Sequence, residues 1–264
     1  DEHNFNKVLF EQMVARTDNN VDYSESEWDT SGDLHVKTFV FSKDNQYDLS
    51  IKGYDNAKNG FEKFEIGTYK EEMFSVFKRI NTELWELLEK GELDFEELKK
   101  KRWNLIFESL GISADGVAFE KYFREYLYES AIPEDGAMEL LKYLHGKYIL
   151  CVASNGPYMQ QVNRLKKSGM LPYFSDLFIS EEIGSSKPSE KFFHTCIKRL
   201  NSKAEQQIQA CEIMIIGDSL SSDMAGGIRV GMQTCFYNPD KKPIPCEMNL
   251  NYCVASLKEI KNIL

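Results

Sequence analysis

The chain has 264 residues, a net charge of −10 and a pI of about 5.1, and 42% of its residues are apolar. This composition is typical of a soluble globular protein with one large or two modest domains. The acidic charge argues against binding to a nucleic-acid backbone, and no apolar run approaches the roughly 18 residues that a membrane-spanning helix needs. The six cysteines form no CxxC pair and no N-terminal apolar signal segment is present, so we expect a cytoplasmic protein with free thiols.

The first 54 residues contain a polar segment and then a β-rich one. Residues 1–34 are acidic and are predicted to form an N-terminal extension, in which Phe5–Val14 has the pattern of one short amphipathic helix. Residues 35–54 allow two interpretations. By local rules, the β-rich run His35–Phe41 and the alternating run Tyr47–Ile51 favour a β-hairpin. The alternative is one buried strand that is followed by a catalytic loop.

Apolar residues recur with a helical period from residue 61 to residue 128, which predicts a bundle of helices with short links. The predicted helices are Tyr69–Leu88, Phe95–Leu110 and Ala118–Tyr128. The aromatic residues of this region are interpreted as packing residues rather than as a cofactor site: Trp85, Trp103, Tyr122, Phe123 and Tyr126. Just before the bundle, residues 54–60 are rich in Asp, Asn and Gly, which are poor helix formers.

After Pro133, short apolar runs alternate with stretches of helical period. The predicted strands are Tyr148–Ala153, Leu177–Ser180, Ile213–Ile216, Gln233–Tyr237 and Tyr252–Ala255. The predicted helices are Gly136–His145, Pro157–Ser168, Glu190–Leu200, Met224–Val230 and Leu257–Leu264. Alternation of this kind predicts an α/β fold, with a parallel sheet that carries helices on both faces.

Polar side chains gather where these predicted elements end. Ser154 and Asn155 follow one strand, Asp218 and Asp223 follow another, and Lys187 precedes a helix. Ligands of parallel sheets bind at the carboxyl ends of the strands, where carboxylates suit Mg²⁺ and a lysine with hydroxyls suits phosphate. Each residue also has a simpler explanation, as a helix cap, a turn residue or a solvated lysine. Their shared edge favours a functional site.

These residues carry a family resemblance. Ser154-Asn155-Gly156, Lys187-Pro188, and Gly217-Asp218 with Asp223 resemble the second, third and fourth motifs of the haloacid dehalogenase (HAD) superfamily. Three longer stretches, N-T-E-L-W-E-L-L-E-K-G-E, I-S-E-E-I-G-S-S-K-P and G-M-Q-T-C-F-Y-N-P, are similar to the pyrimidine 5′-nucleotidase branch of its phosphatases. The resemblance extends from about Phe61 to the C-terminus, which is roughly three quarters of the chain.

The resemblance implies a Rossmann-like core, residues 35–60 and 131–264, with an inserted helical cap, residues 61–130. It also implies Mg²⁺-dependent hydrolysis of small phosphomonoesters, often nucleotides, through an aspartyl-phosphate. Ser154, Asn155 and Lys187 would then bind the phosphate, with Lys187 also catalytic. The implied metal ligands are Asp44, Asp218 and Asp223.

The first motif departs from the family pattern, which is a strand followed by D-x-D-x-T or D-x-D-x-V. Family-like spacing places Ser42 at the nucleophile, Asp44 at the general acid/base and Gln46 at the Thr position. A carboxylate is ionised at neutral pH and binds Mg²⁺, whereas a serine hydroxyl needs a base to remove its proton. Sliding the motif by two places would instead make Asp44 the nucleophile, but Ser42 matches the end of the strand better.

Three hypotheses follow. The chain is a phosphatase with slow or altered chemistry, a pseudoenzyme that binds a phosphorylated ligand or a protein, or a protein whose first 60 residues form an unrelated β-rich segment. The first predicts that Thr38–Phe41 is a central strand beside Ile213–Ile216, and that Ser42, Asp44, Lys187 and Asp218 converge. It also predicts that Asp218 touches the metal directly, whereas Asp223 acts from behind.

Overall fold

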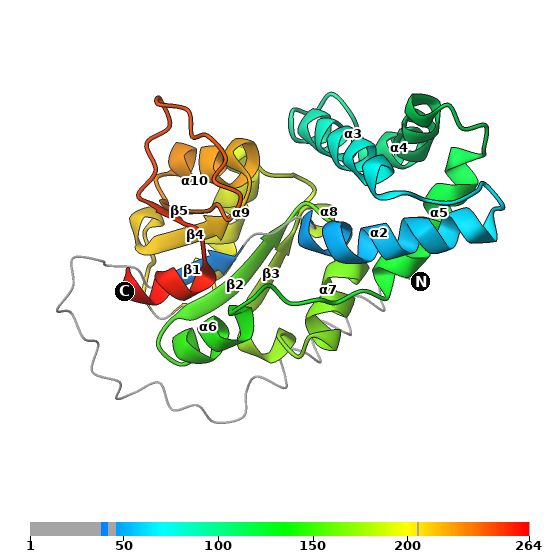
Figure 1. Cartoon of the computed structure of the whole chain (residues 1–264). Helices are drawn as coiled ribbons and strands as arrows, with labels where there is room; N and C mark the ends of the chain where they lie inside the picture. Colours follow the sequence, from blue (N-terminus) through cyan, green and yellow to red (C-terminus); the bar gives the residue numbers. More distant parts are fainter. Residues whose placement is uncertain (1–37, 42–45, 205, 264) are drawn as a thin grey trace, which may run out of the picture.

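The computed structural model describes residues 38–41, 46–204 and 206–263, and its centre is a six-stranded parallel sheet (Figure 1). The strand order is β3-β2-β1-β4-β5-β6. The strands are β1 (Thr38–Phe41), β2 (Ile149–Ser154), β3 (Asp176–Ile179), β4 (Ile213–Gly217), β5 (Gln233–Tyr237) and β6 (Tyr252–Val254). The predicted α/β fold is therefore confirmed, and every predicted strand after Pro133 is present with its ends within one residue.

Strand β1 is a central strand of the sheet, as required by the interpretation of residues 35–54 as one buried strand followed by a loop. Val40 pairs with Cys151 of β2 and with Ile215 of β4, and it is buried. The predicted β-hairpin is wrong, because the segment after β1 continues as helix α2 (Gln46–Lys63) instead of returning as a second strand. A strand that pairs on both sides within the sheet has no edge left for a hairpin partner.

The poor helix formers of residues 54–60 lie inside α2, where tertiary contacts outweigh their propensity. The buried Asn56 side chain donates from Nδ2 to the carbonyl oxygen of Phe123 at 2.7 Å. Gly60 lies against Phe119, and a Cβ at this glycine would come within 2.5 Å of the ring. Both contacts reach α5, so a local pattern could not reveal them.

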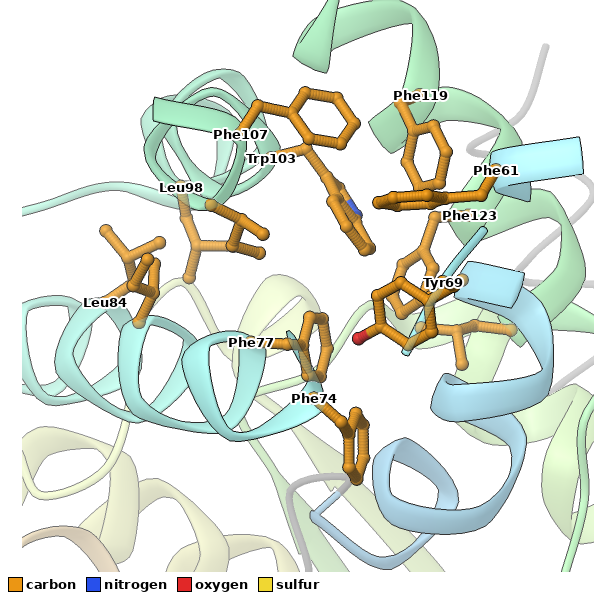
Figure 2. Close-up of a cluster of buried hydrophobic side chains, with 14 of the residues drawn as sticks. Phe61, Tyr69, Phe74, Phe77, Leu84, Leu98, Trp103, Phe107, Phe119 and Phe123 are labelled. Carbon is orange, nitrogen blue, oxygen red and sulfur yellow. The ribbon is translucent and has the colours of Figure 1, made fainter. Parts of the chain in front are cut away.

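Helix α2 packs with α3 (Glu71–Glu89), α4 (Phe95–Leu110) and α5 (Gly116–Tyr128), which lie together to one side of the sheet in Figure 1. Figure 2 shows the aromatic centre of this bundle, around the fully buried Trp103. Phe123 is also buried as predicted, Trp85 and Tyr122 are partly buried, and Tyr126 is 45% exposed, so its assignment as a packing residue is wrong.

The ends of α4 show why it was predicted so closely. The Asp94 side chain accepts from the backbone N–H of Glu97, and the Glu97 side chain accepts in return from the Asp94 N–H, which forms a capping box. Gly111 ends the helix in the left-handed region at a φ of 66°, which glycine adopts without strain. The predicted core–cap boundary at residue 61 falls inside α2, whose Ala57 packs with the cap residues, and that division stays a prediction.

Side chains alternate across the sheet and explain its two helical layers. Ile213 and Ile215 of β4 pack in a cluster with Phe192 of α9 (Glu190–Asn201). Met214 and Ile216 pack instead with residues of α6 (Ala137–Leu144) and η4 (Leu257–Asn262). The remaining helices are α7 (Tyr158–Lys167), α8 (Ser180–Ile183) and α10 (Ala225–Val230), with short helical turns η1 (Leu171–Tyr173), η2 (Ala210–Glu212) and η3 (Leu220–Met224).

Two predicted helices differ in kind from those observed. The C-terminal segment forms a 3₁₀ helix, η4, rather than an α-helix, and the helix predicted from Met224 begins as the π-helical turn η3 and becomes α10 at Ala225. Across the described part of the chain, no helix combines the length and the apolar character that crossing a membrane requires.

Candidate active site

The carboxyl ends of β2 and β4 bring the predicted phosphate and metal residues to one edge of the sheet. Ser154 is the last residue of β2, and Asp218 directly follows the last residue of β4. Between them lies β1, whose last residue, Phe41, pairs with Val152 and Ile216. Ser42 and Asp44 lie outside the described residues, so their predicted convergence with this edge is not tested.

Lys187 is held at this edge by its backbone and its side chain. Asn155 accepts from the Lys187 N–H through Oδ1 and donates through Nδ2 to the Lys187 carbonyl, each at 2.9 Å. The Lys187 ammonium donates to Asp223 Oδ1 at 2.7 Å and to the carbonyl of Ala153 at 3.3 Å. The amide of Asn155 thus fixes the loop that delivers the lysine to the end of β2.

The Lys187–Asp223 ion pair is almost completely buried, with exposed side-chain fractions of 0% and 1%. An ionised group loses its hydration when it is buried, and it stays charged only where a partner of opposite charge compensates. The pair therefore holds the Lys187 ammonium inside the protein beside the strand end where Ser154 lies, with its charge balanced by the Asp223 carboxylate. An arrangement of this kind suits the binding of an anion.

Asp223 is held from both sides. Its second oxygen, Oδ2, accepts from the backbone N–H of Ser219 at 3.1 Å. Gly217 allows this close approach, because a Cβ at that position would lie 2.3 Å from the same oxygen. The part of Asp223 in metal binding stays a prediction.

Ser154 is buried and takes part in the turn that follows β2. Its Oγ accepts from the Gly156 N–H at 3.0 Å, which orients the hydroxyl oxygen toward the turn. The sequence-based interpretation as a turn residue is compatible with this hydrogen bond. A serine hydroxyl is able to accept one hydrogen bond and to donate another.

The metal site that the resemblance implies is represented in part. Asp218 places a carboxylate at the end of β4, and carboxylate oxygens are the donors that Mg²⁺ prefers. Within the described part of the chain, no three His, Cys, Asp or Glu side chains gather closely enough to hold a metal ion. The predicted third carboxylate, Asp44, lies outside that part. The type of donor therefore fits Mg²⁺, and the full ligand set stays a prediction.

The three buried cysteines are poor candidates for a nucleophile. Burial raises the pKa of the Cys151, Cys196 and Cys235 thiols, so these side chains remain protonated near neutral pH. All six cysteines are free, as predicted.

Comparison with known proteins identifies the family. A family model described as haloacid dehalogenase-like hydrolase matches residues 36–231. The chain belongs to this family. The matched residues include β1, Lys187 and Asp223. The resemblance to the haloacid dehalogenase superfamily that the motifs indicated is therefore confirmed.

Relatives and solved structures agree with this family. The HAD-hydrolase YfnB of Bacillus subtilis is 35% identical over 193 residues, which are 73% of this chain and 80% of YfnB. The pyrimidine 5′-nucleotidase PynA of Streptococcus pneumoniae is 30% identical over 206 residues, 76% of this chain and 83% of PynA. The crystal structure of YfnB bound to magnesium superposes with a TM-score of 0.77 at 31% identity and covers 87% of this chain and 98% of YfnB. A dehalogenase structure at 19% identity, with a TM-score of 0.67, shows the shared fold alone.

Sequence reasoning missed one contact between the cap and the core. Glu89, at the end of α3, accepts from the hydroxyls of Ser219 and Ser221, which follow Asp218. The shorter distance to Ser219 is 3.2 Å, from Oγ to Oε1. About 130 residues separate the partners, so no local pattern could have signalled this contact. It joins the cap directly to the loop that carries the predicted metal ligand.

Proposed function

We propose that this hydrolase is a Mg²⁺-dependent phosphomonoesterase for small substrates, nucleotides among them, and that its turnover is slow because Ser42 stands at the nucleophile position. The observation that carries the proposal is the buried Lys187–Asp223 pair beside Ser154 at the carboxyl edge of the sheet. The relatives named pyrimidine 5′-nucleotidases, PynA and YjjG of Escherichia coli, support the choice of substrate class.

The phosphate group is expected to bind between Lys187 and Ser154. Lys187 brings a fixed positive charge, and its loop is held by Asn155, so little reorganisation is needed when the anion arrives. Ser154 adds a hydroxyl donor. Asp223 keeps the lysine charged and directed, rather than touching the substrate.

Asp218 and Asp44 would hold Mg²⁺ at the same edge, where the bound ion would supply positive charge against the phosphate oxygens. Asp44 would also protonate the leaving oxygen, in the general acid role that its motif position implies. The hydroxyl of Ser42 is a weak nucleophile and adds no anionic ligand. The chemical step should therefore be slow and the affinity for Mg²⁺ reduced.

The presence of Ser42 where the family pattern has an aspartate also favours a second candidate function. In this alternative the chain is a pseudoenzyme that binds a phosphorylated ligand without cleaving it. The two candidates share the phosphate site and differ only in turnover. Measurements of binding and of turnover on one preparation therefore separate them.

The test is release of inorganic phosphate from uridine and cytidine monophosphates, sugar phosphates and p-nitrophenyl phosphate, with Mg²⁺ and with EDTA. The proposal predicts slow release that needs Mg²⁺ and is lost in Lys187→Met. Phosphate binding without any release would support the pseudoenzyme. Absence of both binding and release would overturn both candidates.

A further inference from the structure

The last turn of α3 carries a carboxylate at an unfavourable place. Glu89 is the final residue of this cap helix, and the last turn contains no basic side chain. Because a helix ends with unpaired backbone carbonyls, the negative end of its dipole disfavours a carboxylate there. Groups that donate hydrogen bonds stabilise a carboxylate in this position, and the core supplies two of them.

The two donors are serine hydroxyls, and their arrangement resembles that of a diol. Ser219 Oγ lies 3.2 Å from Glu89 Oε1 and 3.4 Å from Oε2, and Ser221 Oγ donates to Oε2. The two hydroxyl oxygens are 3.3 Å apart. Neighbouring cis hydroxyls on a sugar ring have nearly this spacing. The carboxylate of Glu89 is therefore placed to accept from such a diol as it accepts from the two serines.

The carboxylate and its donors are open to exchange with a ligand. Glu89 and Ser219 are partly exposed, and Ser221 is exposed. A ligand hydroxyl can therefore replace a serine hydroxyl at the carboxylate, and the displaced serine can bind water instead. The exchange leaves no buried polar group without a partner, so its cost is small. In dinucleotide-binding folds, an acidic side chain binds ribose hydroxyls in the same way.

A chain of hydrogen bonds fixes this carboxylate relative to the proposed phosphate residues. Ser219, whose hydroxyl contacts Glu89, donates through its backbone N–H to Asp223 Oδ2 at 3.1 Å. Asp223 accepts from Lys187 at 2.7 Å through its other oxygen. Ser219 also directly follows Asp218. The cap carboxylate therefore lies beside the edge of the sheet at which the phosphate is proposed to bind.

We propose that Glu89 selects the substrate by accepting from the cis-diol of a 5′-phosphorylated ribose, and that the diol takes the place of the Ser219 and Ser221 hydroxyls. The substrate class is then a ribose 5-phosphate or a ribonucleoside 5′-monophosphate rather than the 2′-deoxy compound. This inference rests on the proposed function, because Lys187 has to bind the phosphate. It adds a specificity-determining residue from the cap.

The experiment titrates four ligands into the full chain in the presence of Mg²⁺. They are uridine 5′-monophosphate, its 2′-deoxy analogue, its arabino analogue and inorganic phosphate. The arabino compound keeps both hydroxyls but holds them trans. Calorimetry measures each Kd, whether turnover is slow or absent. We expect uridine 5′-monophosphate to bind about tenfold more tightly than either analogue, because each analogue loses a hydrogen bond to a charged acceptor.

Three variants locate the origin of this preference. Glu89→Met removes the acceptor and should bind the three nucleotides equally well. Glu86→Met, at an exposed position one turn earlier on α3, should keep the preference. Ser221→Ala should keep it as well, because this serine occupies the carboxylate only until the ribose arrives. If Glu89 merely tied the cap to the core, Ser221→Ala would instead resemble Glu89→Met.

The outcomes separate this inference from the proposed function. If neither inorganic phosphate nor any nucleotide binds, the phosphate site is wrong and the inference falls with it. The inference alone is overturned if phosphate binds but the native chain holds the ribo and 2′-deoxy compounds equally. It is also overturned if the preference survives in folded Glu89→Met, or if it is lost in Glu86→Met or Ser221→Ala.

Discussion

The cap and the core each contain an ion pair whose two side chains are buried, and the pairs differ in what surrounds them. In the cap, Arg102 donates to both oxygens of Glu120, at 2.9 and 2.5 Å, and to Asn81 Oδ1 at 3.0 Å. In the core, the Lys187 ammonium donates to Asp223 Oδ1 and to the carbonyl oxygen of Ala153, among its contacts with the described residues. The first pair lies inside a helical bundle, and the second lies at the carboxyl edge of a parallel sheet.

The difference teaches that burial of charge does not by itself mark a functional site. The planar guanidinium of Arg102 matches a carboxylate with two parallel hydrogen bonds, an arrangement that fixes three cap helices to one another. The ammonium of Lys187 is a compact charge beside the strand ends where ligands of such sheets bind. Position in the fold, rather than burial, is what distinguishes the pair proposed to serve phosphate binding from the pair inside the cap.

The largest effect is expected from breaking the cap pair. Arg102→Met leaves Glu120 buried without its partner, and the free energy of unfolding should fall by about 3–5 kcal/mol. Phosphate affinity should not change, because the substitution lies away from the sheet edge. Urea denaturation measures the first quantity and calorimetry the second. A loss of stability under about 1 kcal/mol would mean that the pair does not hold the cap together.

The next largest effect is expected on the rate of phosphate release, the reaction in which Lys187 and Asp223 are proposed to take part. Ser42→Asp supplies an ionised nucleophile and a metal ligand together, so phosphate release should rise by several factors of ten, each worth about 1.4 kcal/mol of barrier. Adding Gln46→Thr should raise the rate further. The assay is release from nucleoside monophosphates with Mg²⁺.

Two results would contradict this assignment. If Ser42→Asp folds and binds Mg²⁺ but releases no phosphate, Ser42 is not at the nucleophile position or its loop no longer supports the chemistry. Strong activity of the unmodified chain would mean instead that Ser42 or Asp44 already works as the nucleophile.

The two regions also differ in how far the sequence predicts them. The sheet strands were predictable because each is a short buried apolar run, and α4 because Asp94 and Gly111 mark its ends. Helix α2 was not, since Asn56 and Gly60 oppose a helix locally and are accommodated only by contacts with α5. Propensity alone loses to such tertiary contacts.

The same distinction holds at the site. Ser154, Lys187 and Asp223 could be grouped from the sequence, because the topology of a parallel sheet brings strand ends to one edge. The Arg102–Glu120 pair and the contact of Glu89 depend on which helix faces meet, and no spacing in the chain encodes that. Family resemblance supplied the roles of the motif residues, and the structure supplied their partners.

A smaller effect is expected for the metal. Asp218→Asn removes the carboxylate at the end of β4, and Mg²⁺ affinity should fall by about tenfold or more, equivalent to at least about 1.4 kcal/mol. Asp223→Asn should weaken Mg²⁺ less, because Asp223 is bound to Lys187 and Ser219. Calorimetric titration with Mg²⁺ compares the two variants. Unchanged binding in Asp218→Asn would refute its assignment as a ligand.

The smallest effect is expected where the cap touches the core. Glu89→Gln and Ser221→Ala each disturb a partly exposed charge-assisted hydrogen bond, and a double-mutant cycle should give a coupling energy of about 1 kcal/mol. Unfolding followed by denaturant measures each corner of the cycle. A coupling energy near zero would show that the contact does not stabilise the arrangement of cap and core.

The most direct test of the central claim is a calorimetric titration of inorganic phosphate into the native chain, Lys187→Met and Arg102→Met. The same substitution is thereby made at each buried ion pair, and circular dichroism checks that both variants remain folded. We predict that Lys187→Met weakens phosphate binding at least tenfold and that Arg102→Met leaves it unchanged. Equal phosphate affinity in the native chain and in folded Lys187→Met would contradict the claim that this lysine marks the functional site.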